Sequence, residues 1–346
     1  MTPVVFFDAT SLGIEYSLLA VGIYITFRVL DMADLTVDGS FCLGMAVSAV
    51  CTVGGMAEFG LVAGALAGAC AGIITGLLAT KAHINPLIAG IITSTGLYSI
   101  NVYVLGSPNL SMLGVHKSFD TMHDGLFPGS PNSSMVGGAQ SGGGIPPIDI
   151  SKFIFAGLIV AIVLILLILY FKTSSGLAMR AVGDNEKMSA ASSINVDAYK
   201  IGGLALGNAL VGMTGALLGQ CQGFADMTSG TGMVMVGLAC VIIGEVCGGR
   251  RSVTAGLLCS VVGSIIYRII VQLALGVNLD ANSLKLISAL IVGIFMSVPA
   301  IRTFIKDRKI RNNAMANLDI SKPSTYLPKN YQEENQNNTK QEASHE

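Results

Sequence analysis

The sequence predicts an all-α, polytopic integral membrane protein of about nine transmembrane helices with an inverted internal repeat. Charged residues make up 12% of its 346 residues, about half of the roughly 25% usual in soluble domains. Hydrophobic residues make up 52%, glycine occurs 42 times, and the mean hydropathy is +0.67. A soluble protein needs a charged surface over its hydrophobic core, and this chain has too few charged residues to form one. Most of the chain must therefore face lipid. The net charge of −1 provides no basic surface for nucleic acid.

The transmembrane helices are expected where about 17–25 mostly apolar residues follow one another. The expected spans are 11–30, 40–57, 59–79, 84–105, 151–171, 200–221, 230–247, 252–275 and 283–301. The first is not expected to be a cleaved signal peptide, because it lacks a basic n-region. We therefore predict a transmembrane domain over 1–305 and a polar, disordered tail over 306–346.

Basic residues predict the orientation, because cytoplasmic loops carry an excess of Lys and Arg. With the tail inside, 16 of the 20 basic residues fall on the cytoplasmic side. They are Arg28, Lys81, Lys172, Arg180, Lys187, Lys200, Arg250, Arg251 and those of the tail from Arg302 onward. This predicts a cell-membrane protein with its N-terminus outside. Segment 106–150 is then an external loop, rich in Gly and Pro and expected to be mobile.

Glycine recurs at every fourth position in two of the expected spans. One ladder runs through positions 60, 64, 68, 72 and 76, and the other through positions 215, 219 and 223. Glycines at this spacing lie on one helix face and let helix backbones approach closely in a membrane. Both faces are predicted to pack against neighbouring helices.

A short sequence motif that occurs twice is the main sign of an internal repeat. Ala33-Asp34-Leu35-Thr36 follows the first expected span, and Ala225-Asp226-Met227-Thr228 follows the sixth. Five spans separate the two copies, so they lie on opposite sides of the membrane, as in transporters with inverted repeats around a central pathway. Asp34, Thr36, Asp38 and Asp226 are therefore candidates for the pathway. The alternative is that they only cap helices at the interface.

Polar side chains inside the spans are functional candidates because they are costly in hydrocarbon. Asn101, Asn208 and Gln220 are further candidates for the pathway. Hydrogen bonds that only hold helices together are the alternative. Hydroxyl groups such as those of Thr93 and Thr95 are expected to bond to the preceding helical turn.

The polar segment 172–200 lies on the predicted cytoplasmic side. Asp184 or Asn185 can cap a short helix that reaches about Ser193 and is too polar to cross a membrane. Such a helix either docks a partner or merely connects two spans, and the residues alone leave both open.

Three stretches of the chain resemble a known family. They are GLAMRAVGDNEKMSAASSINV from Gly176, LDMADLTVDGSFCLGM from Leu30 and VIIGEVCGGRRSVTAGLLCSVVGSIIYR from Val241. They resemble permease subunits of branched-chain amino acid and ribose-type ABC importers, in matching order across about residues 10–305. The resemblance is nearest to the subgroup assigned to tryptophan and tyrosine import.

The resemblance implies a homodimer that forms the substrate pathway, a separate ATPase subunit and an extracytoplasmic binding protein. It places Gly176, Arg180, Gly183, Asp184 and Asn185 in an ATPase-coupling turn and helix start. The substrate would be an amino acid or similar small solute, with nucleosides and sugars left open.

Other functional classes are disfavoured by what the sequence lacks. It contains no Gly-Lys dipeptide and so no P-loop, in agreement with hydrolysis by another chain. Its four His residues show no metal-ligating or catalytic spacing, so we expect no enzyme, cofactor or metal. The alternative function is an ion-coupled secondary transporter, whose expected cluster of acids within the spans is not found. A membrane scaffold that transports nothing is a third possibility.

Overall fold

The computed structural model describes residues 3–127, 146–248 and 252–275, with isolated helical positions at Gly293, Ser297 and Arg308. The chain divides into two compact units, Met1–Met296 and Ser297–Glu346. All of the complete helices and strands belong to the first unit. The expected span at 283–301 and the expected tail at 306–346 lie outside the described residues, apart from the isolated positions.

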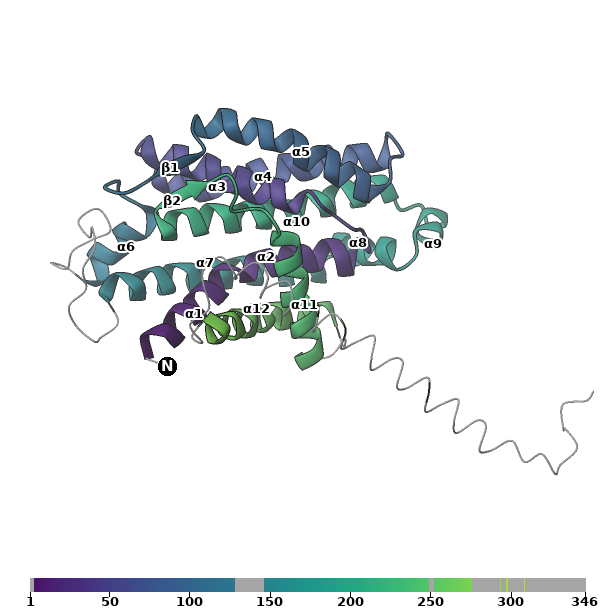
Figure 1. Cartoon of the computed structure of the whole chain (residues 1–346). Coiled ribbons are helices and arrows are strands. Elements are labelled where there is room, and N and C mark those ends of the chain that lie inside the picture. The colour runs from purple at the N-terminus through teal and green to yellow at the C-terminus, as the bar shows by residue number, and fades with distance from the viewer. Residues whose placement is uncertain are drawn as a thin grey trace, which may run out of the picture. The chain divides into compact units, whose positions relative to one another are not determined.

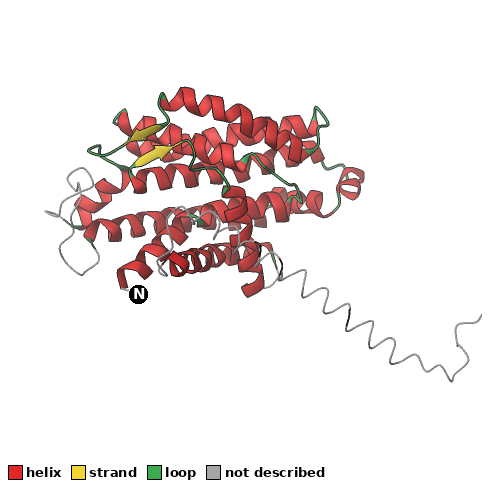
Figure 2. Cartoon of the chain, in the orientation of Figure 1, coloured by secondary structure: helices red, strands yellow, loops and turns green. Residues whose placement is uncertain are grey.

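Eight of the nine expected spans coincide with helices, and the prediction of an all-α membrane protein is confirmed (Figure 2). The helices are α1 (Pro3–Glu15), α2 (Ser17–Tyr24) and the π-helix η1 (Ile25–Val29) for the first span, then α3 (Val37–Val53), α4 (Ala57–Thr80), α5 (Pro86–Leu105), α7 (Pro147–Lys172), α10 (Val196–Gln222), α11 (Met233–Gly248) and α12 (Val253–Leu275). Within the described residues, six helical segments are long and apolar enough to cross a membrane.

Helices α3 and α11 are shorter than the sequence suggests. They contain 17 and 16 residues, which at 1.5 Å per residue is about 25 Å. The hydrocarbon core is about 30 Å thick, so neither helix spans it alone. Hydropathy does not reveal this, because the non-helical turns before the two helices also contain apolar residues.

Helix α10 is the most buried of the long helices, and it packs against α3 and α4 (Figure 1). A Cβ atom on Gly68 would lie 2.2 Å from the carbonyl oxygen of Asn208, and one on Gly72 would lie 2.3 Å from that of Leu204. On the other side of α10, a Cβ atom on Gly215 would lie 2.1 Å from the carbonyl oxygen of Phe41. The predicted close packing of both glycine ladders is therefore confirmed.

A second group of helices is built in a similar way. Helix α2 packs on α11 and α12, which also pack on each other. A Cβ atom on Gly237 of α11 would lie 2.1 Å from Cδ1 of Ile23 on α2. Thus α10 rests on the pair α3 and α4, and α2 rests on the pair α11 and α12. In the chain, α2 precedes α3 and α4 but packs on α11 and α12, whereas α10 precedes α11 and α12 but packs on α3 and α4. An inverted repeat whose two halves exchange their first helix would have this arrangement.

One end of the helices carries the only strands of the described residues. Strand β1 (Asn109–Ser111) pairs in antiparallel fashion with β2 (Phe224–Asp226). Helix α6 (Ser118–Leu126) lies at the same end, whereas α8 (Ser174–Asp184) and α9 (Glu186–Ala191) lie at the opposite end (Figure 1). We name these the α6 end and the α9 end.

Part of the expected mobile loop at 106–150 is folded, which corrects that expectation. Lys117, Phe119 and His123 are buried at the start and along α6. Nδ1 of His123 lies 2.9 Å from Oγ of Ser151 on α7, and burial lowers the pKa of Lys117. Local composition could not predict this, because the stabilising contacts come from α7 and from the start of α4, where the hydroxyl of Ser118 donates to the carbonyl oxygen of Ala57. Residues 128–145 of the loop lie outside the described residues.

Candidate functional site

The two short helices begin next to each other. The Asp38 carboxylate in the first turn of α3 accepts hydrogen bonds from the backbone nitrogens of Gly232 and Val234, each at 3.0 Å. These N–H groups at the start of α11 have no partner within their own helix, so Asp38 serves as a cap from another helix. The thiol of Cys42 donates to the carbonyl oxygen of Met227 at 3.1 Å. The junction therefore joins the two halves of the repeat.

A pocket of about 330 Å³ opens at this junction, and we name it the Asp38 pocket. It is lined by Asp38, Gly39, Cys42, Ser94, Thr95, Tyr98, Asn101, Met227 and Thr231. Its volume is at the lower limit of about 300–1,000 Å³ for small-molecule sites. The lining combines one carboxylate with an amide and several hydroxyl groups, so it can both accept and donate hydrogen bonds to a polar solute.

Asn101 is the buried polar group of this pocket whose bonding is incomplete. Its side chain is 2% exposed, and its Nδ2 donates to the carbonyl oxygen of Gly39 at 3.4 Å. Its Oδ1 has no hydrogen-bond partner among the described residues. A buried polar atom without a partner costs roughly 1–3 kcal/mol, and a ligand that donates a hydrogen bond would remove that cost.

A second cluster of polar side chains lies entirely within the helix packing. The backbone nitrogen of Thr36 donates to Oδ1 of Asp34 at 2.8 Å, and Nδ2 of Asn208 donates to Oδ2 of Asp34 at 2.6 Å. The hydroxyl of Ser40 donates to Oδ1 of Asn208 at 2.7 Å, and the hydroxyls of Thr36 and Thr75 are 2.7 Å apart. All five side chains are buried. This cluster, the Asp34 network, joins the turn before α3 to α3, α4 and α10.

The other two predicted pathway residues lie in neither the Asp38 pocket nor the Asp34 network. Nε2 of Gln220 donates to Oγ of Ser48 and to the carbonyl oxygen of Ala57, each at 3.0 Å, while its Oε1 has no partner among the described residues. Asp226 accepts hydrogen bonds from Thr228 two residues later. The structure thus assigns the seven candidates to four places, with Asp38 and Asn101 in the pocket and Asp34, Thr36 and Asn208 in the network.

At the α9 end, the segment 172–200 forms two helices joined at Asn185. Oδ1 of Asn185 accepts from the backbone nitrogen of Met188 at 3.0 Å, which confirms the predicted cap. Asp184 ends α8, and Asn185 is the N-cap of α9, which begins at Glu186. The side chain of Met188 is 71% exposed, so α9 presents an apolar residue that nothing in the described residues covers.

The expected turn at Arg180 and Gly183 is helical instead, because both residues lie within α8. A Cβ atom on Gly183 would lie 1.8 Å from the carbonyl oxygen of Val29, and one on Gly176 would lie 2.4 Å from that of Tyr170. Glycine at these positions lets α8 pack against η1 and α7. This packing joins α8 to η1, and the chain continues from η1 into the Asp34 network.

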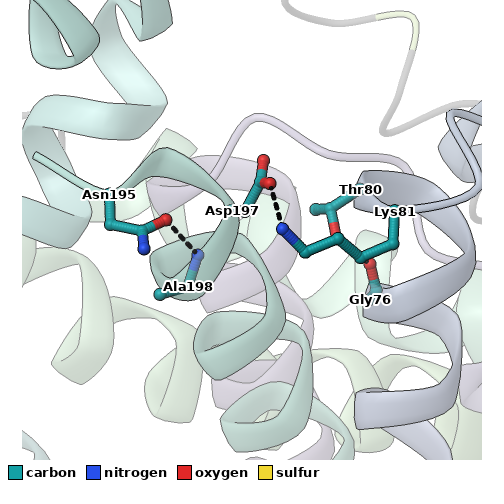
Figure 3. Close-up of polar contacts among 6 residues, drawn as sticks. All are labelled: Gly76, Thr80, Lys81, Asn195, Asp197 and Ala198. Carbon is teal, nitrogen blue, oxygen red and sulfur yellow. Dashed lines mark hydrogen bonds and ion pairs between the residues drawn. The ribbon is translucent and has the colours of Figure 1, made fainter.

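An ion pair also joins helices at this end (Figure 3). Nζ of Lys81, just after α4, lies 2.9 Å from Oδ2 of Asp197 in the first turn of α10. Asn195 caps α10 by accepting from the backbone nitrogen of Ala198 at 3.2 Å. Both charged side chains are exposed, so water and salt screen the pair and it adds little to stability.

Comparison with known proteins assigns a family. The family described as "Branched-chain amino acid transport system / permease component" matches residues 5–297. The chain belongs to this permease family. The chain is thus a multi-pass membrane subunit of an ABC importer for small solutes, and the resemblance in the sequence is confirmed. Family membership favours this function over the ion-coupled transporter, and permeases of this kind work with an ATPase and a substrate-binding protein.

Three curated relatives of this permease are similar over much of their length. The chain is 30% identical to a tyrosine transport system permease protein of Clostridioides difficile, over 84% of the chain and 90% of the relative. It is 31% identical to an uncharacterized protein of Rickettsia prowazekii, over 81% and 92%. It is 31% identical to the ribose import permease protein of Bacillus subtilis, over 65% and 64%.

Sequence reasoning missed several residues of the two clusters. In the permease, the missed residues Ser94 and Tyr98 line one side of the Asp38 pocket from α5, beside Asn101, which was predicted. Their spacing of four and three residues places them on one helix face, and this signal was present in the sequence. Ser40 and Thr75 of the Asp34 network carried no comparable signal, because their partners come from distant parts of the chain. Thr93 and Thr95 bond to the preceding turn as predicted.

Proposed function

We propose that the Asp38 pocket is part of the pathway through which this permease moves its solute. The observation that carries the proposal is the position of the pocket at the junction of the two short helices, where Asp38 and Asn101 come together. Helices that begin inside a bundle direct unpaired N–H groups toward a central site in other transporters. The incompletely bonded Asn101 supports a ligand at this place.

The proposal includes a second copy of the permease across the face of α5. Tyr98 lines the pocket and is 61% exposed, and Tyr103 on the same helix is 87% exposed. A polar pocket that opened into hydrocarbon would leave its groups without partners. A second copy placed against α5 would cover the opening and complete the pathway, in support of a homodimer.

Helices α8 and α9 are proposed to couple this pathway to the ATPase on the cytoplasmic side. Exposed Met188, the cap at Asn185 and the contact of Gly183 with Val29 support this role. The bias of basic residues supports the orientation, with the N-terminus outside and the C-terminus inside.

The coupling proposal is tested by replacing residues 184–190 with a Gly-Ser segment. We expect the variant to insert into the membrane at normal yield but to lose co-purification with the ATPase. The matched control is Lys81→Ala, which removes another exposed polar side chain at the α9 end and is expected to retain the ATPase. Normal co-purification of the ATPase with the replaced segment would refute the proposal.

The proposed solute is an aromatic amino acid. The relative from Clostridioides difficile supports this class, whereas the relative from Bacillus subtilis keeps sugars as the competing class. The test is ATP-driven uptake of labelled tyrosine and labelled ribose by vesicles that contain the permease, its ATPase and its binding protein. We expect uptake of tyrosine, and we expect the variant Asp38→Asn to lower the rate of that uptake at least tenfold. Uptake of ribose alone would refute the amino acid, and uptake driven only by an ion gradient would refute the ABC mechanism.

A further inference from the structure

A second pocket of about 360 Å³ lies between α1, α7, α10 and α12 and shares no residue with the Asp38 pocket. We name it the Glu15 pocket. Its charged lining consists of Asp8, Glu15, Asp149 and Lys152, and its amide groups come from Gln222 and Gln272. Nothing in the proposed pathway uses these groups, so they require a separate explanation.

The carboxylates of this pocket outnumber its cations. Nζ of Lys152 lies 3.2 Å from Oδ1 of Asp149, so these two charges are paired. Among the described residues, no ion pair is found for Asp8 or Glu15. The cavity therefore holds three carboxylates but one lining cation, Lys152, which already pairs with Asp149.

Glu15 is the decisive group because it is almost completely buried. Its side chain is 3% exposed, and its Oε2 has no hydrogen-bond partner among the described residues. Arg268 on α12 has its guanidinium carbon 3.5 Å from the centre of the Tyr16 ring, and among the described residues it forms no ion pair with Glu15. A buried carboxylate is costly unless it is paired, and a positively charged ligand in the pocket would pair it.

We propose that the Glu15 pocket binds a small organic cation through its ammonium group. An ammonium group has three donors, which match the oxygens of Glu15, Asp8 and Gln272 around one cavity. The pocket is larger than a bare metal ion needs, and no group of three metal-ligating side chains is found among the described residues. The ammonium group can belong to a free amine or to an ethanolamine lipid headgroup.

The test uses the full-length permease in nanodiscs of phosphatidylcholine and phosphatidylglycerol. Ethanolamine is titrated while the melting temperature is measured, with ethylene glycol as a neutral probe of similar size. We expect a saturable rise with ethanolamine and none with ethylene glycol, because a ligand that binds only the folded state stabilises it. In a second arm, phosphatidylethanolamine replaces phosphatidylcholine. If the melting temperature is higher with phosphatidylethanolamine and added ethanolamine no longer raises it, the lipid headgroup is the source of the ammonium group. If ethanolamine raises the melting temperature as much as it does without phosphatidylethanolamine, the source is a free amine.

The variant Glu15→Gln keeps the size of the side chain and removes its charge, and it is expected to abolish the response. The matched control is Glu58→Gln, the same substitution at an exposed position at the start of α4, which is expected to respond like the unaltered permease. If Glu15→Gln does not fold, half-buried Asp8→Asn provides the second variant, with at least a fivefold weaker response expected. No response in either lipid, or an unchanged response in the variant that is measured, would overturn the proposal.

Discussion

The turns at Asp34 and Asp226 repeat the residues Ala-Asp-x-Thr and the same local hydrogen bond. The backbone nitrogen of Thr36 donates to Oδ1 of Asp34 at 2.8 Å, and that of Thr228 donates to Oδ1 of Asp226 at 3.0 Å. The first turn is buried and bonded to α10, whereas Asp226 is half-buried and Thr228 is exposed. Local sequence therefore determines the shape of the turn, and the surrounding helices determine what it does.

The two turns also approach each other through the residues that follow them. Asp38 stands four positions after Asp34, and Gly230 stands four positions after Asp226. A Cβ atom on Gly230 would lie 2.2 Å from the carbonyl oxygen of Asp38. The first half of the repeat has Asp38 at this position, and the second half has Gly230. Because Gly230 has no side chain, the carboxylate of Asp38 can reach the start of α11. The repeat is thus asymmetric at the place where we propose the solute passes.

The largest expected effect is that of Asp34→Ala. The substitution leaves one amide N–H of Asn208 and the backbone N–H of Thr36 without an acceptor in a buried site, while the other amide N–H of Asn208 keeps the carbonyl oxygen of Leu204. We expect a loss of about 3 kcal/mol in the free energy of unfolding, since unpaired buried groups keep their full desolvation cost. Unfolding in mixed micelles with increasing dodecyl sulfate measures this loss. A loss smaller than the losses expected below for Gly230→Ala and Thr36→Val would show that the Asp34 network does not stabilise the turn.

This contrast also indicates how much of the structure the sequence could predict. The positions of eight helices, the glycine faces and the cap at Asn185 follow from periodicity and residue type along the chain. The bond between Asn208 and Asp34 joins residues 174 positions apart, and no local pattern specifies that partner. The same limit applies to the site, because Asp38 and Asn101 could be selected as polar residues but their shared pocket depends on how α3, α5 and α11 pack.

The variant Gly230→Ala tests the contact between the two halves. Its added Cβ atom would meet the backbone of Asp38 and, at 2.6 Å, Sγ of Cys42. Extra atoms in a packed site cost about 1–3 kcal/mol, so we expect a loss of about 2 kcal/mol together with reduced uptake. The control is Gly96→Ala on α5, where a Cβ atom would meet nothing within 4 Å. Equal stability of the two variants would contradict the close approach of the halves.

The variant Thr36→Val tests whether the buried turn depends on its bond to α4. It leaves the hydroxyl of Thr75 without its partner on Thr36, although that hydroxyl still lies 3.2 Å from the carbonyl oxygen of Ala71. We expect a loss of about 1 kcal/mol for the single variant. In the double variant with Thr75→Val, both hydroxyls are replaced, and we expect no further loss. Simple addition of the two single losses would show that the hydroxyls do not interact.

The smallest expected effect is that of Asp226→Ala, the counterpart of the first substitution in the exposed turn. Among the described residues, its side chain accepts hydrogen bonds from the backbone and hydroxyl of Thr228 alone, and water can replace both of them. We expect a loss of about 0.5 kcal/mol, at the lower limit for a single net hydrogen bond, measured in the same micelles as Asp34→Ala. Because the two substitutions remove the same side chain from the same local turn, their difference measures what burial and the bond to Asn208 add. If both cost the same, the turn itself would be the stabilising unit, and the contrast between the two halves would have no energetic basis.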